Sequence, residues 1–303
     1  MKIIRFKVNR LATLVISMFT FIYVNAGNVN IDGLKYYLFP ETHEVVIDNG
    51  NTWSGVLEIP SEVSYKGESI NVSGMAWLAF GNCTGLTKVH IPKTIINVIH
   101  HVLSDDPDVS GAVSADFMNP FEGCTSLESI EVDENNPAMQ SIGDVLFSKD
   151  GTKLYAFPAG KKTDSYVVPE GVTWIGGGAF NSNSYLGSLE FPESVSGICG
   201  YAFNDCALDT LVIRGIIDDS CIDGYLFLGL SESAKLYVQT SEMDRYMGIF
   251  PGKILPLEEY HTGILAPTSL HNQTHPIYDL NGVRTDQPKK GIYIQNGKKR
   301  IVR

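Results

Sequence analysis

The residues that could most readily carry out a reaction are cysteines on glycine-flanked turns, as in Gly81-Asn-Cys83-Thr-Gly85. A sharp turn between glycines is one way to present a nucleophilic thiol, because glycine tolerates close backbone approach. The surrounding stretch AFGNCTGLTKVHI recurs, however, as PFEGCTSLESIEV, with Phe, Cys, Leu and two apolar residues at the same spacing. Repetition is typical of a packing position rather than of a nucleophile. We therefore predict that Cys83 serves packing and not catalysis.

The other cysteines follow the same argument. Cys124 and Cys206 occupy the repeat position of Cys83, and Asn183 takes it in a further copy. A reactive thiol needs exposure and a cationic neighbour, whereas this position faces the interior between Phe and Leu. Side chains on stacked parallel strands also orient poorly for a disulfide, so we predict buried, free thiols. Cys199 and Cys221 fall at different positions of their repeats and are not expected to pair.

Candidate metal ligands occur in two places. Asp106-Pro-Asp108-Val-Ser110-Gly111 matches the first half of an EF-hand loop, but Phe117 stands at the twelfth position, where a bidentate Glu is required. We interpret residues 104–118 as a solvated acidic loop, for which the sequence alone does not decide calcium binding. His271 and His275 have helical metal-ligand spacing without the glutamate of the metalloprotease motif.

No phosphate loop, Gly-x-Ser-x-Gly motif or paired carboxylates in a recognisable frame accompany these residues, and His100-His101 is a similarly weak signal. We predict that the protein is not an enzyme and has no catalytic residues, no resident metal and no cofactor. The alternative of a hydrolase that uses Cys83 or a histidine-bound metal is disfavoured by the repeat argument.

The elements that position these residues form a repeat, which reads Ala-Phe-x-x-(Cys/Asn)-x-x-Leu-x-x-apolar-x-apolar. Its phenylalanines at positions 180, 203 and 227 are separated by 23 and 24 residues, within the period of about 20–29 residues of leucine-rich repeats. The copies begin at Ala79, Pro120, Ala179, Ala202 and Leu226. Each Leu-x-x-apolar-x-apolar half is predicted to be a short strand that pairs in parallel with the next copy, and each Ala-Phe half to be the return path.

These units resemble the BspA-like leucine-rich repeat proteins, whose repeats are of the Treponema pallidum type, and the resemblance covers nearly the whole mature chain. It implies a mainly β solenoid with a parallel strand ladder and short irregular, 3-10 or helical return segments. The stretch IDGLKYYLFPETHEVVIDNG resembles the family's amino-terminal β cap, and GDVLFSKDGTKLYAFP its inserted β hairpin. The resemblance further implies adhesion, for instance to extracellular matrix proteins.

The resulting domain map has five parts. We expect a signal peptide at 1–26, a β cap at 27–75, a solenoid at 76–258 with insertions near 95–118 and 135–168, a linker at 259–276, and a carboxy-terminal β segment at 277–303. In that segment Asn281-Gly282 and Asn296-Gly297 are strong tight-turn signals. It resembles the sorting domains of exported Bacteroidetes proteins but is shorter, and an ordinary β hairpin with a basic tail is the alternative.

The amino terminus indicates export. Lys2, Arg5, Lys7 and Arg10 precede an apolar run from Leu11 to Val24 and a Val-x-Ala signal that ends at Ala26. The run is shorter than the roughly 20 residues that a spanning helix needs. We expect cleavage near Ala26 and a secreted or surface-located protein without a membrane span in the mature chain.

Charge restricts the partners. Cleavage would take the formal charge from −11 to −15, and the basic end after residue 283, with seven Lys or Arg and one Asp, leaves −21 on residues 27–283. Such a body repels phosphates, so nucleic acid is not an expected partner.

The repeat instead supplies a surface, because alternate strand residues point outward. The predicted binding face has one row of Lys88, Ser129, Ser188, Thr210 and Lys235 and a second row of His90, Glu131, Glu190, Val212 and Tyr237. Repeat arrays commonly bind partners on such faces. We expect a host or microbial extracellular protein or glycan as the ligand, with a structural spacer or surface-layer component as the alternative. The sequence indicates neither the ligand nor the oligomeric state.

Overall fold

The computed structural model describes residues 27–260, apart from 40, 41, 49, 100–117 and 223, together with four strands near the carboxy terminus. The chain divides into two units, Met1–Tyr260 and His261–Arg303. The predicted signal peptide, the acidic loop, the His100-His101 pair, and His271 and His275 all lie outside the described residues.

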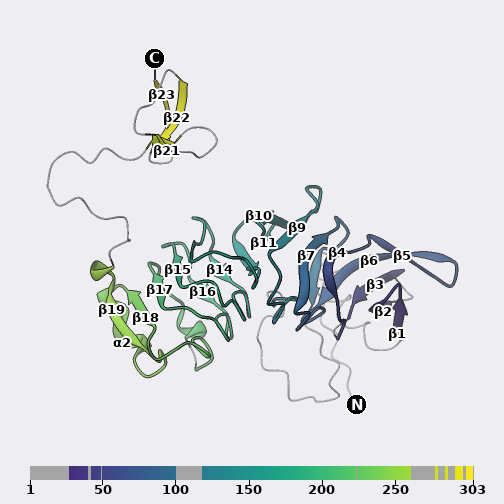
Figure 1. Cartoon of the computed structure of the whole chain (residues 1–303), viewed down its shortest axis with the longest axis horizontal. Coiled ribbons are helices and arrows are strands. Elements are labelled where there is room, and N and C mark those ends of the chain that lie inside the picture. The colour runs from purple at the N-terminus through teal and green to yellow at the C-terminus, as the bar shows by residue number, and fades with distance from the viewer. Residues whose placement is uncertain are drawn as a thin grey trace, which may run out of the picture. The chain divides into compact units, whose positions relative to one another are not determined.

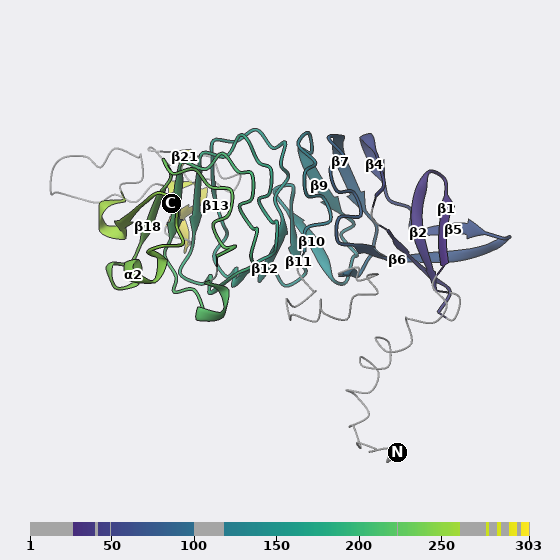
Figure 2. The same cartoon turned by 90° about the horizontal axis from the view of Figure 1, so that it is seen from below.

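The first unit is almost entirely β structure, and its strands lie side by side along its length (Figures 1 and 2). At its amino-terminal end one sheet has the order β1-β2-β3-β6-β5, with β8 also paired to β6. Its strands are β1 Gly27–Ile31, β2 Leu34–Phe39, β3 Glu44–Ile47, β5 Glu62–Tyr65, β6 Glu68–Ala76 and β8 Asn97–Ile99. The strands β3, β6 and β8 are parallel to one another, and the remaining pairings are antiparallel.

The Leu-x-x-apolar-x-apolar halves build two further sheets. The N-terminal strand sheet has the order β4-β7-β9, with β4 Ser54–Glu58, β7 Gly85–Ile91 and β9 Ser129–Val132. The C-terminal strand sheet has the order β13-β15-β17-β18-β19, with β13 Ser165–Val167, β15 Ser188–Phe191, β17 Thr210–Ile213, β18 Lys235–Val238 and β19 Lys253–Pro256. Every pairing in both sheets is parallel. Because β4 takes part, parallel pairing starts before the predicted solenoid boundary at residue 76.

The inserted segment and the return side form another sheet, with the order β10-β11-β12-β14-β16. Its strands are β10 Met139–Ile142, β11 Val145–Ser148, β12 Lys153–Ala156, β14 Trp174–Ile175 and β16 Gly197–Ile198. The first three strands are antiparallel, and β12, β14 and β16 are parallel. The few helical turns lie near the end of the unit, at η2 Asp219–Cys221, η3 Thr240–Glu242, α2 Met243–Tyr246 and η4 Leu257–Glu259.

The second unit contains one antiparallel sheet in its described residues, with the order β21-β20-β22-β23. Its strands are β20 Ile277–Tyr278, β21 Arg284–Thr285, β22 Gly291–Gln295 and β23 Lys298–Val302. Strands β22 and β23 pair with Gln295 opposite Lys298, and the predicted Asn281-Gly282 and Asn296-Gly297 turns lie outside the described residues.

Strand β11 separates two hydrophobic cores in the first unit. All four of its residues are buried, and successive side chains of a strand point to opposite faces. Val145 and Phe147 accordingly belong to the core of the C-terminal half, whereas Leu146 belongs to the core of the N-terminal half. The inserted hairpin is therefore part of the interior, and its strand β11 packs against one core on each face.

Phenylalanine rings of successive repeat copies stack on one another in both cores, which explains why each copy has Phe at the same position. Phe80 and Phe121 stack with ring centroids 5.7 Å apart in the N-terminal half. In the C-terminal half Phe180 stacks on Phe203, and Phe203 on Phe227, each with a separation of 6.2 Å. All five rings are buried, so the packing role predicted for this position is confirmed.

The return side joins the two halves at residues 118–123. Met118 forms an isolated parallel bridge with Gly177, and the Asn119 side chain donates to the Gly178 carbonyl at 2.9 Å. Close by, Trp77 Nε1 donates to Glu122 Oε1 at 3.1 Å, and this carboxylate lies against Gly178, where a Cβ atom would come within 2.1 Å of it. Burial raises the pKa of Glu122 to about 7. We refer to residues 118–123 and 177–181 as the joint.

Candidate functional site

The cysteine turn of the repeat is sharp, but it directs the thiol inward. In Gly81-Asn82-Cys83 the left-handed residue is Asn82, with φ of 60°, and neither Gly81 nor Gly85 has a positive φ. Ser182 and Asp205 take the same conformation in later copies, with φ of 59° and 56°. The turn therefore belongs to the repeat, and Cys83, Cys124 and Cys206 are buried as predicted.

Each of these thiols donates to a carbonyl of the preceding coil. Cys83 Sγ bonds Asn51 O at 3.1 Å, Cys124 Sγ bonds Phe80 O at 3.0 Å, and Cys206 Sγ bonds Phe180 O at 2.6 Å. Asn183 makes the corresponding contact through Nδ2 to Pro158 O at 3.2 Å. The shared requirement is thus a small buried donor, which explains why Cys and Asn alternate at this position.

The thiols are poorly suited to nucleophilic chemistry. Burial raises the pKa of both Cys124 and Cys206 to about 12, and it also raises the pKa of Cys83. All five cysteines are free in the described structure. Cys199 accepts a hydrogen bond from Trp174 Nε1 at 3.1 Å, and its pKa is raised by burial first and by Cys221 second. Both thiols are free, in agreement with the prediction that they do not pair.

The predicted binding face falls on two separate sheets. In the N-terminal strand sheet Lys88 pairs in register with Ser129, and His90 with Glu131. Lys88 Nζ lies 2.6 Å from Glu131 Oε1, and His90 Nδ1 lies 3.8 Å from Glu131 Oε2. The Glu131 carboxylate raises the pKa of Lys88 through this hydrogen bond. The charges of this part of the face thus compensate one another.

Residues of the inserted hairpin extend this charge network. Asp144, in the β10–β11 turn, accepts a hydrogen bond from Ser129 Oγ at 3.0 Å and pairs with Lys161 Nζ at 2.6 Å. The Lys161 ammonium, then the Ser129 hydroxyl, hold the pKa of Asp144 below its usual range. Sequence periodicity missed Asp144 and Lys161, because neither belongs to the repeat.

The C-terminal strand sheet holds the rest of the predicted rows. Ser188, Thr210 and Lys235 are in register across β15, β17 and β18, and so are Glu190, Val212 and Tyr237. Glu190 Oε1 pairs with Arg214 Nε at 2.6 Å, where Arg214 directly follows β17. The Tyr260 ring lies 5.1 Å from the Tyr237 ring, and it also interacts with Ser188 and Glu190.

Val212 does not contribute an exposed side chain, and this part of the prediction is wrong. The residue is on the predicted row, between Glu190 and Tyr237, but its exposed fraction is 0%. Tyr260 interacts with residues on both sides of Val212, with Tyr237 on β18 and with Ser188 and Glu190 on β15. Tyr260 lies outside the repeat period, so only its place at the end of the unit offered a signal.

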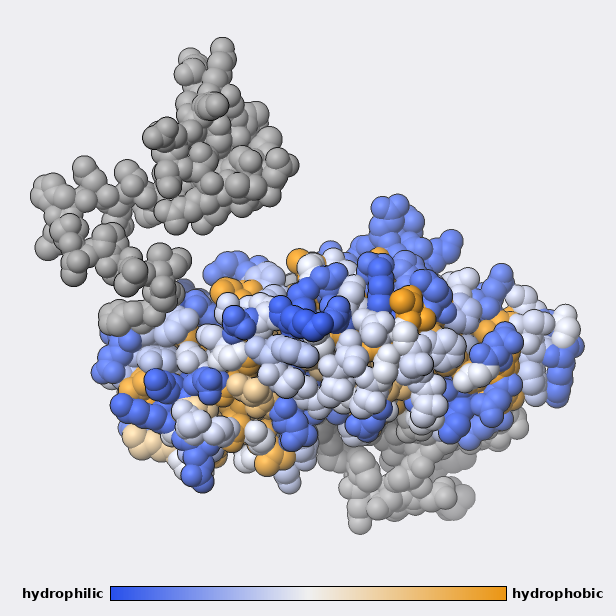
Figure 3. Space-filling view, in the orientation of Figure 1, coloured by the Kyte–Doolittle hydropathy of each residue, from blue (hydrophilic) through white to orange (hydrophobic). Residues whose placement is uncertain are grey.

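The strand face is also not continuous. Strand β9 belongs to the three-stranded sheet and β15 to the five-stranded sheet, and the inserted hairpin lies between them in sequence. The rows predicted from Lys88 to Lys235 and from His90 to Tyr237 therefore divide after Ser129 and Glu131. The face drawn in Figure 3 is mostly hydrophilic, with hydrophobic residues in small separate groups.

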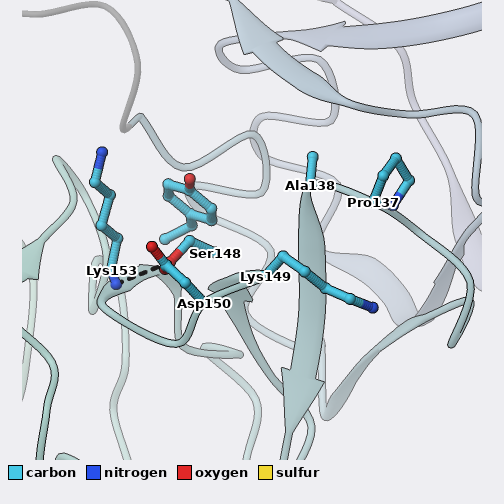
Figure 4. A pocket seen from close by; sticks show the side chains of 7 residues that line it. Pro137, Ala138, Ser148, Lys149, Asp150 and Lys153 are labelled. Carbon is cyan, nitrogen blue, oxygen red and sulfur yellow. Dashed lines mark hydrogen bonds between the residues drawn. The ribbon is translucent and has the colours of Figure 1, made fainter.

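A shallow hollow of about 400 Å³ lies beside the inserted hairpin (Figure 4). Its lining includes Pro137, Ala138, Ser148, Asp150 and Tyr155. Asp150 accepts hydrogen bonds from the Ser148 hydroxyl and from the backbone and side chain of Thr152, which lower its pKa to about 2. These bonds shape the hairpin turn, and a carboxylate with a pKa of about 2 is too weak a base to activate the Ser148 hydroxyl near neutral pH.

The described residues contain neither a metal-ligand cluster nor a membrane-spanning helix. No group of three or more His, Cys, Asp or Glu in that part of the chain has metal-binding geometry. No helix there has the length and apolar character needed to cross a bilayer.

Comparison with known proteins identifies the repeat. The model of the BspA type leucine rich repeat region matches in six copies over residues 69–159 and 153–246. A search of curated proteins found no match.

Solved structures of similar fold include three bacterial proteins. The pneumococcal vaccine antigen PcpA is 14% identical, with 76% of this chain and 98% of that chain covered at a TM-score of 0.28. The T. pallidum leucine rich repeat protein is 19% identical, with 61% and 71% covered at 0.32. A leucine-rich repeat protein from Bacteroides ovatus is 16% identical, with 75% and 76% covered at 0.31. The superpositions are too loose to carry an argument about function.

Proposed function

Because the chain belongs to the BspA-type leucine-rich repeat family, we propose that it is an exported, non-enzymatic protein that binds an extracellular protein or glycan at the bacterial surface. Residues 1–26 direct export and are removed near Ala26. The repeats form one solenoid, with β1–β3, β5 and the first part of β6 as its cap and the β10–β12 segment as an insertion. Intact-mass measurement of the exported protein tests the cleavage.

The observation that supports binding is the regular presentation of polar side chains on the strand faces. Five parallel strands place Ser165, Ser188, Thr210, Lys235 and Lys253 in one register row. An extended sheet of this kind offers many weak contacts in fixed spacing, which suits a long or repetitive partner. The buried thiols, by contrast, offer no reactive group to a substrate.

The test is an array of matrix proteins and of host and microbial glycans, probed with the full exported chain. A variant with Lys88, His90 and Glu131 all changed to Ala removes the compensated cluster of the N-terminal strand sheet without leaving an unpaired charge. A second variant, Thr210→Ala with Lys235→Ala, removes the row of the C-terminal strand sheet. The matched control changes Lys66 and Glu68, which lie on the distant β5–β6 hairpin. Loss of an array signal in either face variant, with the control unchanged, supports the proposal.

A structural role is the second candidate, and one observation favours it. Lys88, Glu131, Glu190 and Arg214 are all engaged in ion pairs within the face, so much of the surface is already satisfied without a ligand. A spacer or surface-layer component would associate end to end and bind nothing on the array. Light scattering over a concentration series distinguishes the two functions.

A further inference from the structure

The C-terminal end of the strand face carries cations that the fold itself leaves uncompensated. Lys235 and Lys253 are register partners on the adjacent parallel strands β18 and β19, and both are exposed. Within the described part of the chain neither ammonium group has an ion-pair partner. This contrasts with Lys88, Lys161 and Arg214, which all pair with carboxylates.

Two like charges on neighbouring strands repel each other, because the strands are only about 4.8 Å apart. The arrangement is also unusual for this protein, whose residues 27–283 carry a formal charge of −21. Two adjacent ammonium groups on such a body attract anions, even though the exposed Asp209, directly before the neighbouring strand β17, lies next to Lys235. The lysine pair therefore has the local positive charge that an anion-binding site requires, unlike the acidic surface around it.

An aromatic pair adjoins the lysines. Tyr237 follows Lys235 by two residues on β18, and its ring lies 5.1 Å from that of Tyr260 at an interplanar angle of 52°. Tyrosine combines an apolar ring with a polar tip, so it packs well against the C–H face of a sugar ring. Thr210, the register neighbour of Lys235, adds a hydroxyl to the same row.

We propose that this end of the strand face, formed by Thr210, Lys235, Lys253, Tyr237 and Tyr260, binds an acidic polysaccharide whose sugar rings carry carboxylates. The inference rests on the proposed binding function and names its ligand class. A chain that crosses the strands meets a hydroxyl and two ammonium groups in succession, while the tyrosines contact ring faces. Glu190 does not repel such a ligand strongly, because Arg214 compensates its charge.

A glycan fits this surface better than a protein does. Protein partners are usually anchored by side chains that fill well-packed pockets, and the hollow described above lies elsewhere, at the inserted hairpin. The row instead repeats one kind of contact from strand to strand. A polymer with a charge on every unit matches that repetition.

The experiment is titration calorimetry of the full exported chain with oligogalacturonate, with a neutral glucan of the same length as the comparison. We expect binding of the uronate and at least about tenfold weaker binding of the glucan. Lys235→Gln with Lys253→Gln should weaken uronate binding about tenfold, and the double Arg variant at these positions should retain it. The matched control, Lys298→Gln with Lys299→Gln, makes the same charge change in the basic carboxy-terminal segment and should leave the affinity within about twofold.

The opposite results would overturn the inference. If the Lys298/Lys299 variant loses binding and the Lys235/Lys253 variant keeps it, the basic segment is the anion site. If duplex DNA competes as well as uronate does, the protein binds polyanions without selectivity. Binding of a neutral glycan or a protein through the strand face would refute the ligand class and leave the proposed function standing. A chain that binds nothing on the array would refute both.

Discussion

The two strand sheets of the solenoid are built from the same repeat but treat charge differently. In the N-terminal strand sheet Lys88 pairs with Glu131, and the neighbouring Asp144 pairs with Lys161. In the C-terminal strand sheet Glu190 is paired, whereas Lys235 and Lys253 have no ion-pair partner among the described residues. The interior of both halves is the same, with stacked Phe rings and buried thiol or amide donors. The repeat therefore specifies the core, and the outward positions are free to differ between one sheet and the other.

The largest expected effect on stability comes from a substitution in one core, and it tests whether the two cores are independent. Phe203→Ala removes a fully buried ring between Phe180 and Phe227 and should cost about 3–5 kcal/mol of unfolding free energy. Because β11 separates the cores, hydrogen exchange should accelerate in the C-terminal half and change little in β4 and β7. Exchange measured by mass spectrometry checks this, with Phe80→Ala as the reciprocal variant. Equal acceleration in both halves would contradict the two-core description.

The joint between the halves should respond to pH through Glu122. Burial raises its pKa from 4.5 to about 7, so the folded state holds this proton more tightly than the unfolded state. Its contribution to stability is therefore complete below about pH 4.5 and is lost as the pH rises towards 7, by up to about 3 kcal/mol. Glu122→Gln should remove that loss, as measured by urea unfolding between pH 4 and 8. The same pH slope in the variant would exclude Glu122 as its source.

A smaller effect on the unfolding free energy is expected from the Arg214–Glu190 ion pair of the C-terminal strand sheet. Arg214→Gln leaves the mostly buried Glu190 carboxylate without its partner and should cost about 1–2 kcal/mol. The double variant Arg214→Gln with Glu190→Gln should recover most of that loss. Chemical unfolding measures both variants. A double variant as unstable as the single one would show that packing over Val212, rather than the charge pair, matters.

The smallest effect on stability should come from the exposed lysines. Lys235→Gln with Lys253→Gln relieves repulsion between adjacent strands and should alter the unfolding free energy by about 0.5 kcal/mol or less. The same variant is expected to change uronate affinity about tenfold, so stability and binding separate at these two residues. A large loss of stability would show that the lysines serve the fold.

Thiol labelling tests whether the buried cysteine position is equivalent in the two halves. Cys124 and Cys206 lie in different halves, and burial raises the pKa of each to about 12. Neither should react with an aromatic disulfide reagent at pH 8 until the protein unfolds. Rapid labelling of one of them in the native state would break the equivalence of the repeats.

Sequence periodicity predicted the interior well and the surface less well. The spacing of Phe, Cys and Leu specified buried positions, because stacking in a repeat leaves each of them one environment. It did not predict that β11 would divide the core. A strand that is buried on both faces has no alternation of apolar and polar residues, so the sequence does not indicate which core each side chain faces. The burial of Val212 beside Tyr260 was not predicted, and neither was the hydrogen bond from Ser129 to Asp144, whose charge Lys161 compensates. Such contacts arise from segments outside the repeat, where a period gives no information.

The joint has a mechanical consequence. In the strand sheets neighbouring coils are connected by parallel ladders several residues long. Across the joint the strand pairing shrinks to the Met118–Gly177 bridge, which is supported by hydrogen bonds from Asn119 to Gly177 and Gly178 and from Gly123 to the Asn181 side chain. In the proposed surface role, a load applied through a bound ligand would pass along this path. The strand pairing is shortest at the joint, so tension would strain it there first, with β11, which packs into both cores, as the second connection between the halves.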